Sequence, residues 1–453
     1  MASEGEVNAS AFSGIFENFR YSTRKYMPQN MTSASKMTKT DIRHILTIFL
    51  IFLVCFIFSQ KYISSLAKID KNLYNIGMKY IIITYGCQMN VHESEKLAYI
   101  CEKLGYTPTD KREEADLIIF NTCAIREGAE DRVFGNVGAL KKLKKMRPNI
   151  IIAVCGCMTQ KEQTANYILR TFPFVDIVLG TFNLANFAHY IEAVKTGRQL
   201  EILKEGEIDE TVPYKRSDRD NAWVNIMQGC NNFCTYCIVP YVRGREKSRK
   251  EENILKEIKE IVEQKKFKKI TLLGQNVNSY GQDLKDGSTF SKLLSDICKI
   301  DGDFSLTFMT SHPKDLTSDV IDVIAKEKKI LKEIHLPAQS GNNRILALMN
   351  RRYTREKYLS IIKEIREKIP NCKITSDFIV GFPTETEEEF KDTLSLVKEV
   401  KFDGIFAFMY SPREGTVAEK MEGQIDQKTK KRRVNALLRL EKEIQEEKRN
   451  GRK

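Results

Sequence analysis

Three cysteines stand close together near the middle of the chain, in the segment QGCNNFCTYC. Cys230, Cys234 and Cys237, here called the loop triad, have the spacing C-x3-C-x2-C. A structural zinc site usually takes four ligands, and no His or Cys follows this triad before Cys298. Three thiolates on one loop suit a 4Fe-4S cluster in which the protein binds three irons and leaves the fourth open. The loop triad therefore predicts an iron-sulfur centre with one free coordination position.

Three further cysteines are far apart in sequence, yet each follows a β-branched run. Cys87, Cys123 and Cys157, here called the rim triad, come after KYIIITY, DLIIF and NIIIAV. Parallel strands end at one edge of a sheet, where open α/β sheets bind ligands, so we expect these thiols to converge on a second metal site. The alternative is that they are small buried apolar residues. We expect that role for the other cysteines: Cys55, Cys101, Cys155, Cys298 and Cys372.

Strands and helices alternate along most of the chain, which predicts an α/β protein. Between 79 and 200, four β-branched runs alternate with amphipathic segments, which indicates a parallel sheet in a three-layer domain. Residues 201–221 are charged and resemble a linker. About six more strand–helix repeats then run to about residue 420, the rhythm of a complete or partial (β/α) barrel. Residues 425–449 predict a basic helix.

Composition narrows the class of protein. With 453 residues, 42% hydrophobic and 29% charged, the chain is neither a small disulfide scaffold nor globally disordered. The odd count of 11 cysteines favours a reducing compartment. A net charge of +13 fits an anionic partner such as nucleic acid, although most of this excess lies at the two ends of the chain.

The first 77 residues predict a leader with one apolar run, at 45–58. These fourteen uncharged residues are fewer than the roughly 20 that a bilayer span needs. Three interpretations stay open: a weak membrane anchor, a buried or interfacial helix, or upstream sequence joined to the protein by a misassigned start before Met78. We favour the misassigned start over membrane contact.

The motifs around all six triad cysteines resemble those of the radical S-adenosylmethionine (SAM) methylthiotransferases. The loop triad after the first barrel strand is similar to the superfamily's cluster motif, and YGCQMNVHESEK, FNTCAIREGAEDR and VCGCMTQ look like the N-terminal domain of the methylthiotransferases. The likeness continues through GQNVNSYG, TSHPKD, HLPAQSGNNRIL and SDFIVGFPTET. GCQMN and RGREKSR are similar to the MiaB-type tRNA branch. Other branches have Pro-Lys or Lys after the first cysteine, where this chain has Gln88 and Met89.

The resemblance implies an enzyme with two 4Fe-4S clusters and SAM as cofactors. The loop triad would hold the cluster that splits SAM to a 5′-deoxyadenosyl radical. The rim triad would hold an auxiliary cluster that carries the sulfur, and a second SAM would supply the methyl group. The implied reaction is methylthiolation of carbon 2 of N6-isopentenyladenosine at position 37 of tRNA, which gives 2-methylthio-N6-isopentenyladenosine.

Polar residues on strand-end loops of the barrel are candidates for SAM contacts. Tyr236 matches the family position that packs near the adenine. The other candidates follow later strands, and loop capping is the alternative for each of them: Gln275, Asn276, Ser311, Gln339, Ser340 and Asp377.

Basic residues beside the cysteines have two candidate roles. Arg126, Arg243 and Arg245 could offset the charge of a cluster or bind tRNA phosphates. We assign no role to the histidines within or near the matched motifs, because a single His is more often structural: His92, His312 and His335.

The resemblance also implies partners and a domain plan. We expect a cytoplasmic monomer that acts on tRNA carrying isopentenyladenosine, with an electron donor such as flavodoxin or ferredoxin and a sulfur donor. The plan is a leader (1–77), a methylthiotransferase N-terminal domain (78–205), a radical SAM core (216–424) and a basic helix (425–453). Relatives continue into a small RNA-binding β-barrel, the TRAM domain, so we expect a truncated chain whose tRNA affinity is in doubt.

Two alternatives to this function stay open. The first is a methylthiotransferase that acts on threonylcarbamoyladenosine tRNA or on a ribosomal protein. The second is a zinc-containing nucleic-acid-binding protein without enzymatic activity.

Overall fold

The structure is a computed structural model. It describes residues 77–125, 128–203, 205–206, 208, 210, 213–218 and 220–450. The apolar run 45–58 and Arg126 lie outside these residues. What was predicted for them from the sequence therefore stays a prediction. Among the helices of the described ranges, none is both long and apolar enough to cross a membrane.

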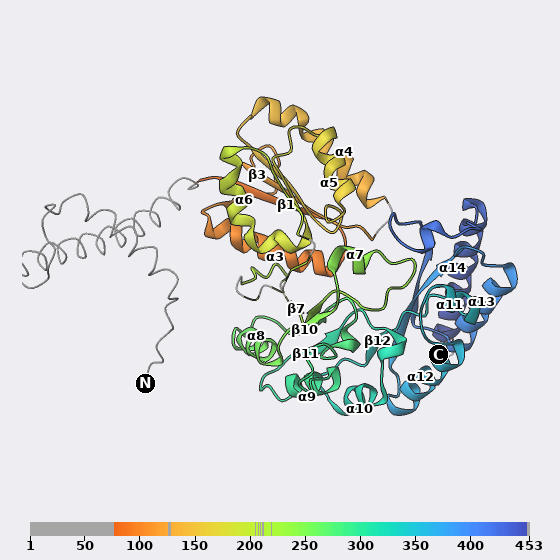
Figure 1. Cartoon of the computed structure of the whole chain (residues 1–453). Coiled ribbons are helices and arrows are strands. Elements are labelled where there is room, and N and C mark those ends of the chain that lie inside the picture. The colour runs from red at the N-terminus through yellow and green to blue at the C-terminus, as the bar shows by residue number, and fades with distance from the viewer. Residues whose placement is uncertain are drawn as a thin grey trace, which may run out of the picture. The chain divides into compact units, whose positions relative to one another are not determined.

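A parallel sheet forms the N-terminal part, with strand order β2-β1-β3-β4-β5-β6 (Figure 1). The strands are β1 Lys79–Thr84, β2 Thr107–Pro108, β3 Leu117–Thr122, β4 Ile151–Gly156, β5 Ile177–Leu179 and β6 Gln199–Glu201. Ile82 pairs in register with Ile119, and Ile119 pairs with Ala153. The carboxyl ends of β1, β3 and β4 therefore lie side by side.

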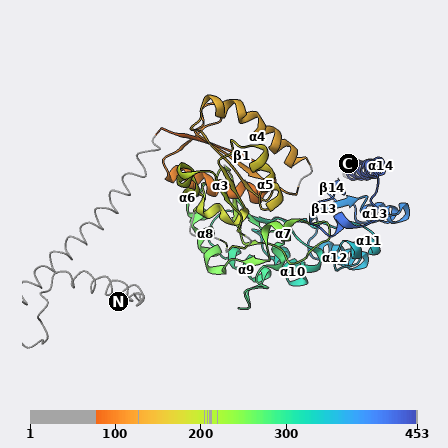
Figure 2. The same cartoon turned by 45° about the horizontal axis from the view of Figure 1, so that its top comes forward.

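Helices cover both faces of this sheet, as Figures 1 and 2 show. α3 Gln88–Lys103 and α6 Phe187–Ala193 pack on one face, where Leu97 and Phe187 share a core with Ile119. α4 Ala129–Met146 and α5 Glu162–Thr171 pack on the other, where Val133 and Ile168 share a core with Ile118. Successive side chains of a strand point to opposite faces, which explains why neighbours such as Ile118 and Ile119 serve different cores. The predicted three-layer domain is confirmed.

Six parallel strands of the described chain follow, in two three-stranded sheets of order β11-β10-β7 and β12-β13-β14. They are β7 Asn221–Asn225, β10 Lys269–Leu273, β11 Ser305–Phe308, β12 Glu333–His335, β13 Lys373–Val380 and β14 Gly404–Met409. A parallel bridge joins Leu306 of β11 to Ile330, just before β12. This arrangement confirms the predicted partial barrel.

Helices separate these strands in sequence, and Figure 2 shows several of them in a row along the strands. They are α8 Glu251–Glu263, α9 Phe290–Cys298, α10 Ser318–Lys326, α11 Asn343–Leu348, α12 Arg355–Lys368 and α13 Glu387–Val400. Their apolar sides and the strands form one continuous core, to which Ile258, Leu293 and Ile362 contribute.

The predicted basic helix is α14 Gln427–Asn450. It is more than a charged surface helix, because Leu437, Leu440 and Ile444 recur at helical spacing and are buried in the barrel core. α14 packs mainly on β14 and on α13. The last strand of the barrel therefore depends on this helix for its cover.

Short elements complete the description, and sequence periodicity did not predict them. β8 Met227–Gln228 and β9 Lys247–Ser248 form an antiparallel pair around the loop triad, which α7 Val239–Arg243 follows. The 3-10 helices are η1 Thr181–Asn186, η2 Val194–Thr196, η3 Val277–Ser279, η4 Pro313–Asp315 and η5 Ala418–Lys420.

Candidate metal centres

The rim triad lies at the carboxyl edge of the N-terminal sheet. Cys87 follows β1 and is the N-cap residue of α3. Cys123 comes directly after β3, and Cys157 comes directly after β4. Because these three strands are neighbours in the sheet, residues far apart in sequence reach one edge.

The amide of Asn90 links two of these thiols. Its Oδ1 atom lies 3.8 Å from Cys87 Sγ and 3.9 Å from Cys157 Sγ. Its Nδ2 atom donates to the carbonyls of Tyr85 at 2.9 Å and Thr122 at 2.8 Å, which fixes the oxygen toward the thiols. Asn90 lies in the GCQMN motif, but its role depends on this geometry and was not predicted from the sequence.

Gly86 makes room for the third thiol. It has φ +120, and a Cβ atom placed on it would lie 2.6 Å from Cys123 Cβ and 2.9 Å from Cys123 Sγ. Any other residue here would both adopt an unfavourable backbone conformation and displace Cys123. The structure thus brings the rim triad together, and its role as a ligand set stays a prediction.

Burial makes several triad thiols weak acids in the metal-free chain. It raises the pKa of Cys157 to about 12, against the opposing effect of nearby Arg243. It likewise raises the pKa of Cys230 to about 11 and that of Cys237 to about 12. Thiols bind iron as thiolates, so cluster assembly must release protons from these sites.

A prediction on pH dependence follows for the metal-free protein. A Cys157 thiol that stays protonated in the folded chain but ionises near pH 9 when unfolded makes the free energy of unfolding fall as pH rises above 9. The contribution of this one thiol is about 1 kcal/mol between pH 9 and 10 and approaches about 1.4 kcal/mol per pH unit above that. We expect Cys157→Ser to flatten the slope of unfolding free energy against pH between 9 and 10. An unchanged slope would contradict the raised pKa.

The loop triad lies between β8 and α7 and is held from two sides. Cys230 N donates to Gly244 O at 3.2 Å, and Cys237 N donates to Cys234 O at 2.9 Å. Phe233 has φ +48, a left-handed conformation that is uncommon for a bulky residue. Asn350 Nδ2 donates to the carbonyl of Phe233 at 3.0 Å and so supports this conformation. Backbone N–H and carbonyl groups of the loop thus have hydrogen-bond partners, which fix its conformation.

Arg351 is a buried cation beside this loop that sequence reasoning missed. Its Nη1 atom lies 3.3 Å from Cys234 Sγ and 3.4 Å from Tyr236 Oη, and Nη2 donates to Pro337 O at 3.0 Å. A cation here would stabilise thiolates of the loop triad. The signal in the sequence is weak, since MNRRYTR contains three arginines and only tertiary contacts distinguish them.

The predicted SAM contacts fall into two groups. Some use their polar atoms within the protein: Gln275 Oε1 accepts from Gly229 N at 2.5 Å, and Ser340 Oγ accepts from Asn342 N at 3.2 Å. Asp377 Oδ2 lies 3.4 Å from His335 Nε2. Tyr236 lies beside Arg351 and packs against an apolar cluster. These contacts fit the loop-capping alternative at Gln275 and Ser340.

The others retain a buried polar atom for which the described residues offer no partner. These atoms are Asn276 Oδ1, Ser311 Oγ and Gln339 Oε1. Buried polar atoms in folded proteins normally have partners, so each of these fits contact with a bound polar ligand. Asn276 is itself held in place, because its Nδ2 atom donates to Asp315 Oδ2 at 2.7 Å.

His312 joins this second group, although no role was assigned to it from the sequence. Its Nδ1 atom accepts from Lys314 N at 3.1 Å, so the proton of a neutral ring lies on Nε2, which is buried without a partner among the described residues. Burial, with help from the positive charge of Arg351, lowers the pKa of His312 to about 2. The ring is therefore a neutral donor.

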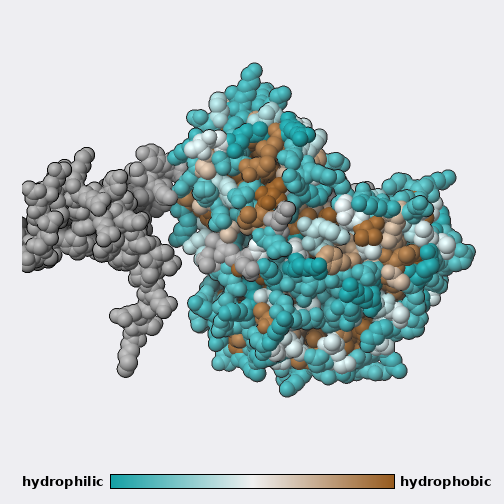
Figure 3. Space-filling view, in the orientation of Figure 1, coloured by the Kyte–Doolittle hydropathy of each residue, from teal (hydrophilic) through white to brown (hydrophobic). Residues whose placement is uncertain are grey.

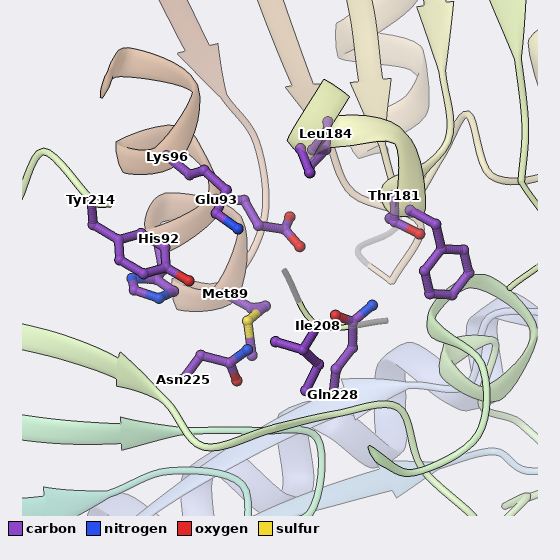
Figure 4. Close-up of a pocket in the computed structure, with 12 residues that line it drawn as sticks. Met89, His92, Glu93, Lys96, Thr181, Leu184, Ile208, Tyr214, Asn225 and Gln228 are labelled. Carbon is purple, nitrogen blue, oxygen red and sulfur yellow. The ribbon is translucent and has the colours of Figure 1, made fainter. Parts of the chain in front are cut away.

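A cavity of about 60 Å³ lies beside α3 (Figure 4). Met89, His92 and Glu93 of α3 line it together with Thr181 and Gln228. None of the residues predicted to bind iron or SAM is among those that line this cavity.

The two triads supply the donors that 4Fe-4S clusters require. All six cysteines are free thiols, with no disulfide between them. Within the described ranges, no three His, Cys, Asp or Glu side chains are grouped so as to hold a single metal ion. In a 4Fe-4S cluster each thiolate binds a different iron, so its ligands need not meet at one point. The residues present therefore fit two clusters, each with one open iron.

Two protein families match the chain in the regions that contain these triads. The family described as "Uncharacterized protein family UPF0004" matches residues 79–180, and the "Radical SAM superfamily" matches residues 224–397. The first range contains the rim triad and the second contains the loop triad.

Solved structures agree in fold. A radical S-adenosylmethionine methyltransferase, TsrM from Kitasatospora setae, has a TM-score of 0.55 and 11% identity, and the match covers 76% of this chain and 77% of that chain. The cobalamin-dependent radical enzyme OxsB has a TM-score of 0.52 and 11% identity over 81% of this chain and 56% of that chain. At such low identity these matches show a shared fold alone.

Curated relatives match at much higher identity. The tRNA-2-methylthio-N(6)-dimethylallyladenosine synthase of Carboxydothermus hydrogenoformans is 52% identical over 365 residues, which cover 80% of this chain and 83% of the relative. The protein of the same name from Clostridium botulinum (strain Langeland) is 53% identical over 378 residues, 83% of each chain. Given this identity over most of its length, the chain belongs to the family of tRNA-2-methylthio-N6-dimethylallyladenosine synthases, within the radical SAM superfamily.

Proposed function

We propose that this protein methylthiolates carbon 2 of N6-isopentenyladenosine at position 37 of tRNA. The observation that carries the proposal is the presence of both thiol triads, each at a strand-end edge, in a chain 52% to 53% identical to relatives named for that product. Carbon 2 of adenine is aromatic and offers no leaving group, so the reaction needs radical chemistry. A radical SAM enzyme meets that need.

We propose that the work is divided between the two parts of the fold. Members of this family use SAM and two 4Fe-4S clusters. Residues 78–205 would hold the auxiliary cluster on the rim triad, and residues 216–424 would hold the other on the loop triad. A cluster bound by the loop triad would supply the electron that cleaves SAM, and a cluster bound by the rim triad would supply a site for the transferred sulfur. The leader (1–77) and the helix (425–453) would stand outside this chemistry.

The chain's own residues would fix the cofactor by supplying hydrogen bonds that the fold leaves unused. Ser311 Oγ, Gln339 Oε1 and Asn276 Oδ1 have no partner in the described part of the chain, and His312 offers a neutral N–H donor. SAM carries an ammonium, a carboxylate and a ribose, which need both donors and acceptors. Gln275 would act indirectly rather than by touching SAM, because its side chain accepts from the backbone N–H of Gly229 at the start of the cysteine loop.

Apolar side chains on the last strand would receive the substrate. Phe406 is 55% exposed and Phe408 is 52% exposed, whereas the alternating Ile405 and Ala407 pack toward the core. The Phe406 ring lies 6.0 Å from the His335 ring. Figure 3 shows that the face of the molecule seen there is mostly hydrophilic, with a few apolar patches. Aromatic faces of this kind suit a purine ring or a prenyl group.

The cysteine loop itself carries a second exposed aromatic group. Arg245 lies over the Phe233 ring at 4.4 Å, and the Tyr241 ring meets Phe233 edge-on at 6.1 Å. Tyr241 is 49% exposed, and Arg245 is exposed as well. Aromatic and arginine side chains together bind unpaired bases and phosphates, so this group supports contact with the anticodon loop.

We expect Tyr241→Ala to weaken binding of an isopentenylated anticodon stem-loop by about tenfold, because one lost base-stacking contact costs about 1–3 kcal/mol. Fluorescence anisotropy under anaerobic conditions would measure the dissociation constant. Tyr167→Ala is the matched control, since Tyr167 is 50% exposed but belongs to α5. Equal effects of the two substitutions would contradict a binding role for Tyr241.

Analysis of tRNA nucleosides tests the function itself. A strain that lacks this gene should accumulate N6-isopentenyladenosine and lose its 2-methylthio derivative, and the gene should restore it. Unaltered 2-methylthio-N6-isopentenyladenosine in the deletion strain would refute the proposal. A change in the threonylcarbamoyladenosine derivative or in a ribosomal protein would instead support the other methylthiotransferase substrates.

Metal analysis separates the enzyme from a zinc protein. Anaerobic purification should give about eight irons per chain with the colour of iron-sulfur clusters. Zinc without iron would refute the enzymatic reading. The electron donor, which we propose is a flavodoxin or ferredoxin, and the sulfur donor can then be tested by reconstitution. We further propose a cytoplasmic monomer.

A further inference from the structure

Arg243 connects the barrel to the rim triad. It is the last residue of α7, six residues after Cys237 in sequence, and its side chain is only 2% exposed. Nη1 donates to Glu93 Oε1 at 2.6 Å and Nη2 donates to Glu93 Oε2 at 3.0 Å, a two-pronged ion pair with α3. A bidentate pair fixes orientation as well as charge.

The same guanidinium reaches the acceptor shared by two thiols. Arg243 Nη2 donates to Asn90 Oδ1 at 3.0 Å, the oxygen that also faces Cys87 Sγ and Cys157 Sγ. The apolar residues around it are continuous, since Cys157 packs with Ile238 and Val242. Arg243 is therefore connected to Cys87 and Cys157 through one side chain, that of Asn90.

Cluster binding would change the charge at this place. Thiols that bind iron become thiolates, which no longer donate to Asn90 Oδ1. A buried group of thiolates beside a partly negative amide oxygen is unfavourable unless a cation lies near, and Arg243 is already held there. Each further electron on the cluster adds negative charge and makes that cation more important.

We propose that Arg243 is a positioning residue that sets the reduction potential of the cluster on the rim triad, and that Glu93 moderates its effect. The inference rests on the proposed cluster site and adds to it a residue supplied by the other half of the fold. Nearby positive charge favours the reduced cluster and raises its potential. The negative charge of Glu93 opposes this effect, and the Glu93 side chain is 16% exposed and borders the cavity of Figure 4.

The test is redox titration of the full chain with the loop triad replaced by alanine, so that only the rim cluster remains. We expect Arg243→Met to shift the midpoint potential to more negative values and Glu93→Gln to shift it to more positive values. Arg243→Lys keeps the charge and should stay near the parent protein. The two opposite shifts are the signature that a merely structural ion pair would not give.

Arg249 provides a matched control. It is also a buried arginine of RGREKSR, 6% exposed, and it pairs with Glu257 at 2.7 Å rather than facing the rim triad. Arg249→Met should leave the potential in place. Should Arg243→Met fail to fold because it strands Glu93, the double variant Arg243→Met with Glu93→Gln removes both charges. Its potential should lie between those of the two single variants.

Failures of the two proposals are distinguishable. A rim triad that binds no iron in this background would refute the cluster site and this inference together. Iron that binds normally with a potential insensitive to Arg243 and Glu93, or equally sensitive to Arg249, would refute only the inference. Circular dichroism and iron content would establish that each variant is folded and loaded.

Discussion

Replacing all three cysteines of the loop triad with alanine is expected to abolish SAM cleavage and tRNA methylthiolation together. The same change in the rim triad should abolish methylthiolation but leave SAM cleavage, because the two thiol sets belong to separate parts of the fold. Each variant should retain about four of about eight irons. Iron assay, 5′-deoxyadenosine release and nucleoside analysis by mass spectrometry measure the three quantities.

Two other cysteines serve as matched controls for these variants. Cys298 and Cys372 are partly buried against the barrel core. Cys298→Ala and Cys372→Ala should keep the full iron content and activity. If a rim-triad variant still formed methylthiolated product, the assignment of the auxiliary cluster to the rim triad would be wrong.

The second large effect concerns stability and the end of the chain. Arg433→Met is expected to lower the free energy of unfolding by about 3–5 kcal/mol, because it leaves a buried carboxylate unpaired. Arg433 is 4% exposed and its Nη1 atom lies 2.7 Å from Glu385 Oε2, whose side chain is fully buried. Glu385 Oε2 also accepts from Gly381 N at 2.6 Å, so this pair fastens α14 to the turn after β13.

The size of this effect should depend on pH in a defined direction. Burial raises the pKa of Glu385 even with Arg433 beside it. Removal of the cation raises that pKa further, so the carboxyl accepts a proton as the solution is acidified and the unpaired charge disappears. The loss of unfolding free energy caused by Arg433→Met should therefore be largest near neutral pH and become smaller toward pH 5. Urea unfolding at several pH values measures it.

The neighbouring arginine is the control. Arg432 is 56% exposed and pairs at 2.7 Å with Glu387, which is 39% exposed. A surface pair of this kind contributes about 0–1 kcal/mol, so Arg432→Met should have a small effect at every pH. Similar losses for Arg432 and Arg433 would contradict the argument from burial.

Elements with a strong local signal were predictable from the sequence. Runs such as LIIF and IIAV at β3 and β4 are apolar, contain β-branched residues and alternate with amphipathic segments, so their strands and parallel order could be predicted from pattern alone. The rule that parallel strands end at one edge then placed Cys87, Cys123 and Cys157 together. Short strands such as β8, with two residues, contain too little sequence for periodicity to reveal.

Contacts between distant residues were not predictable in this way. Asn90 and Arg243 meet across 153 positions of sequence, and Arg351 meets Cys234 across 117. No local pattern separates these side chains from other polar residues in the same motifs. The candidate SAM contacts fall into two groups for the same reason. The Gln275 side chain accepts a hydrogen bond from Gly229 N, whereas Ser311 Oγ has no partner among the residues that the structure describes.

The two triads differ in how much of the chain must fold before they exist. The loop triad is closed by a turn of eight residues, whereas the rim triad requires three strands spread over residues 79–157 to pair in register. Closing longer loops costs more chain entropy, and more of the fold must be in place. The loop triad therefore needs a smaller part of the fold to be in place before its thiols come together than the rim triad does. If the proposed assignment is right, a chain weakened in its N-terminal sheet should lose the cluster on the rim triad first and continue to split SAM without forming product.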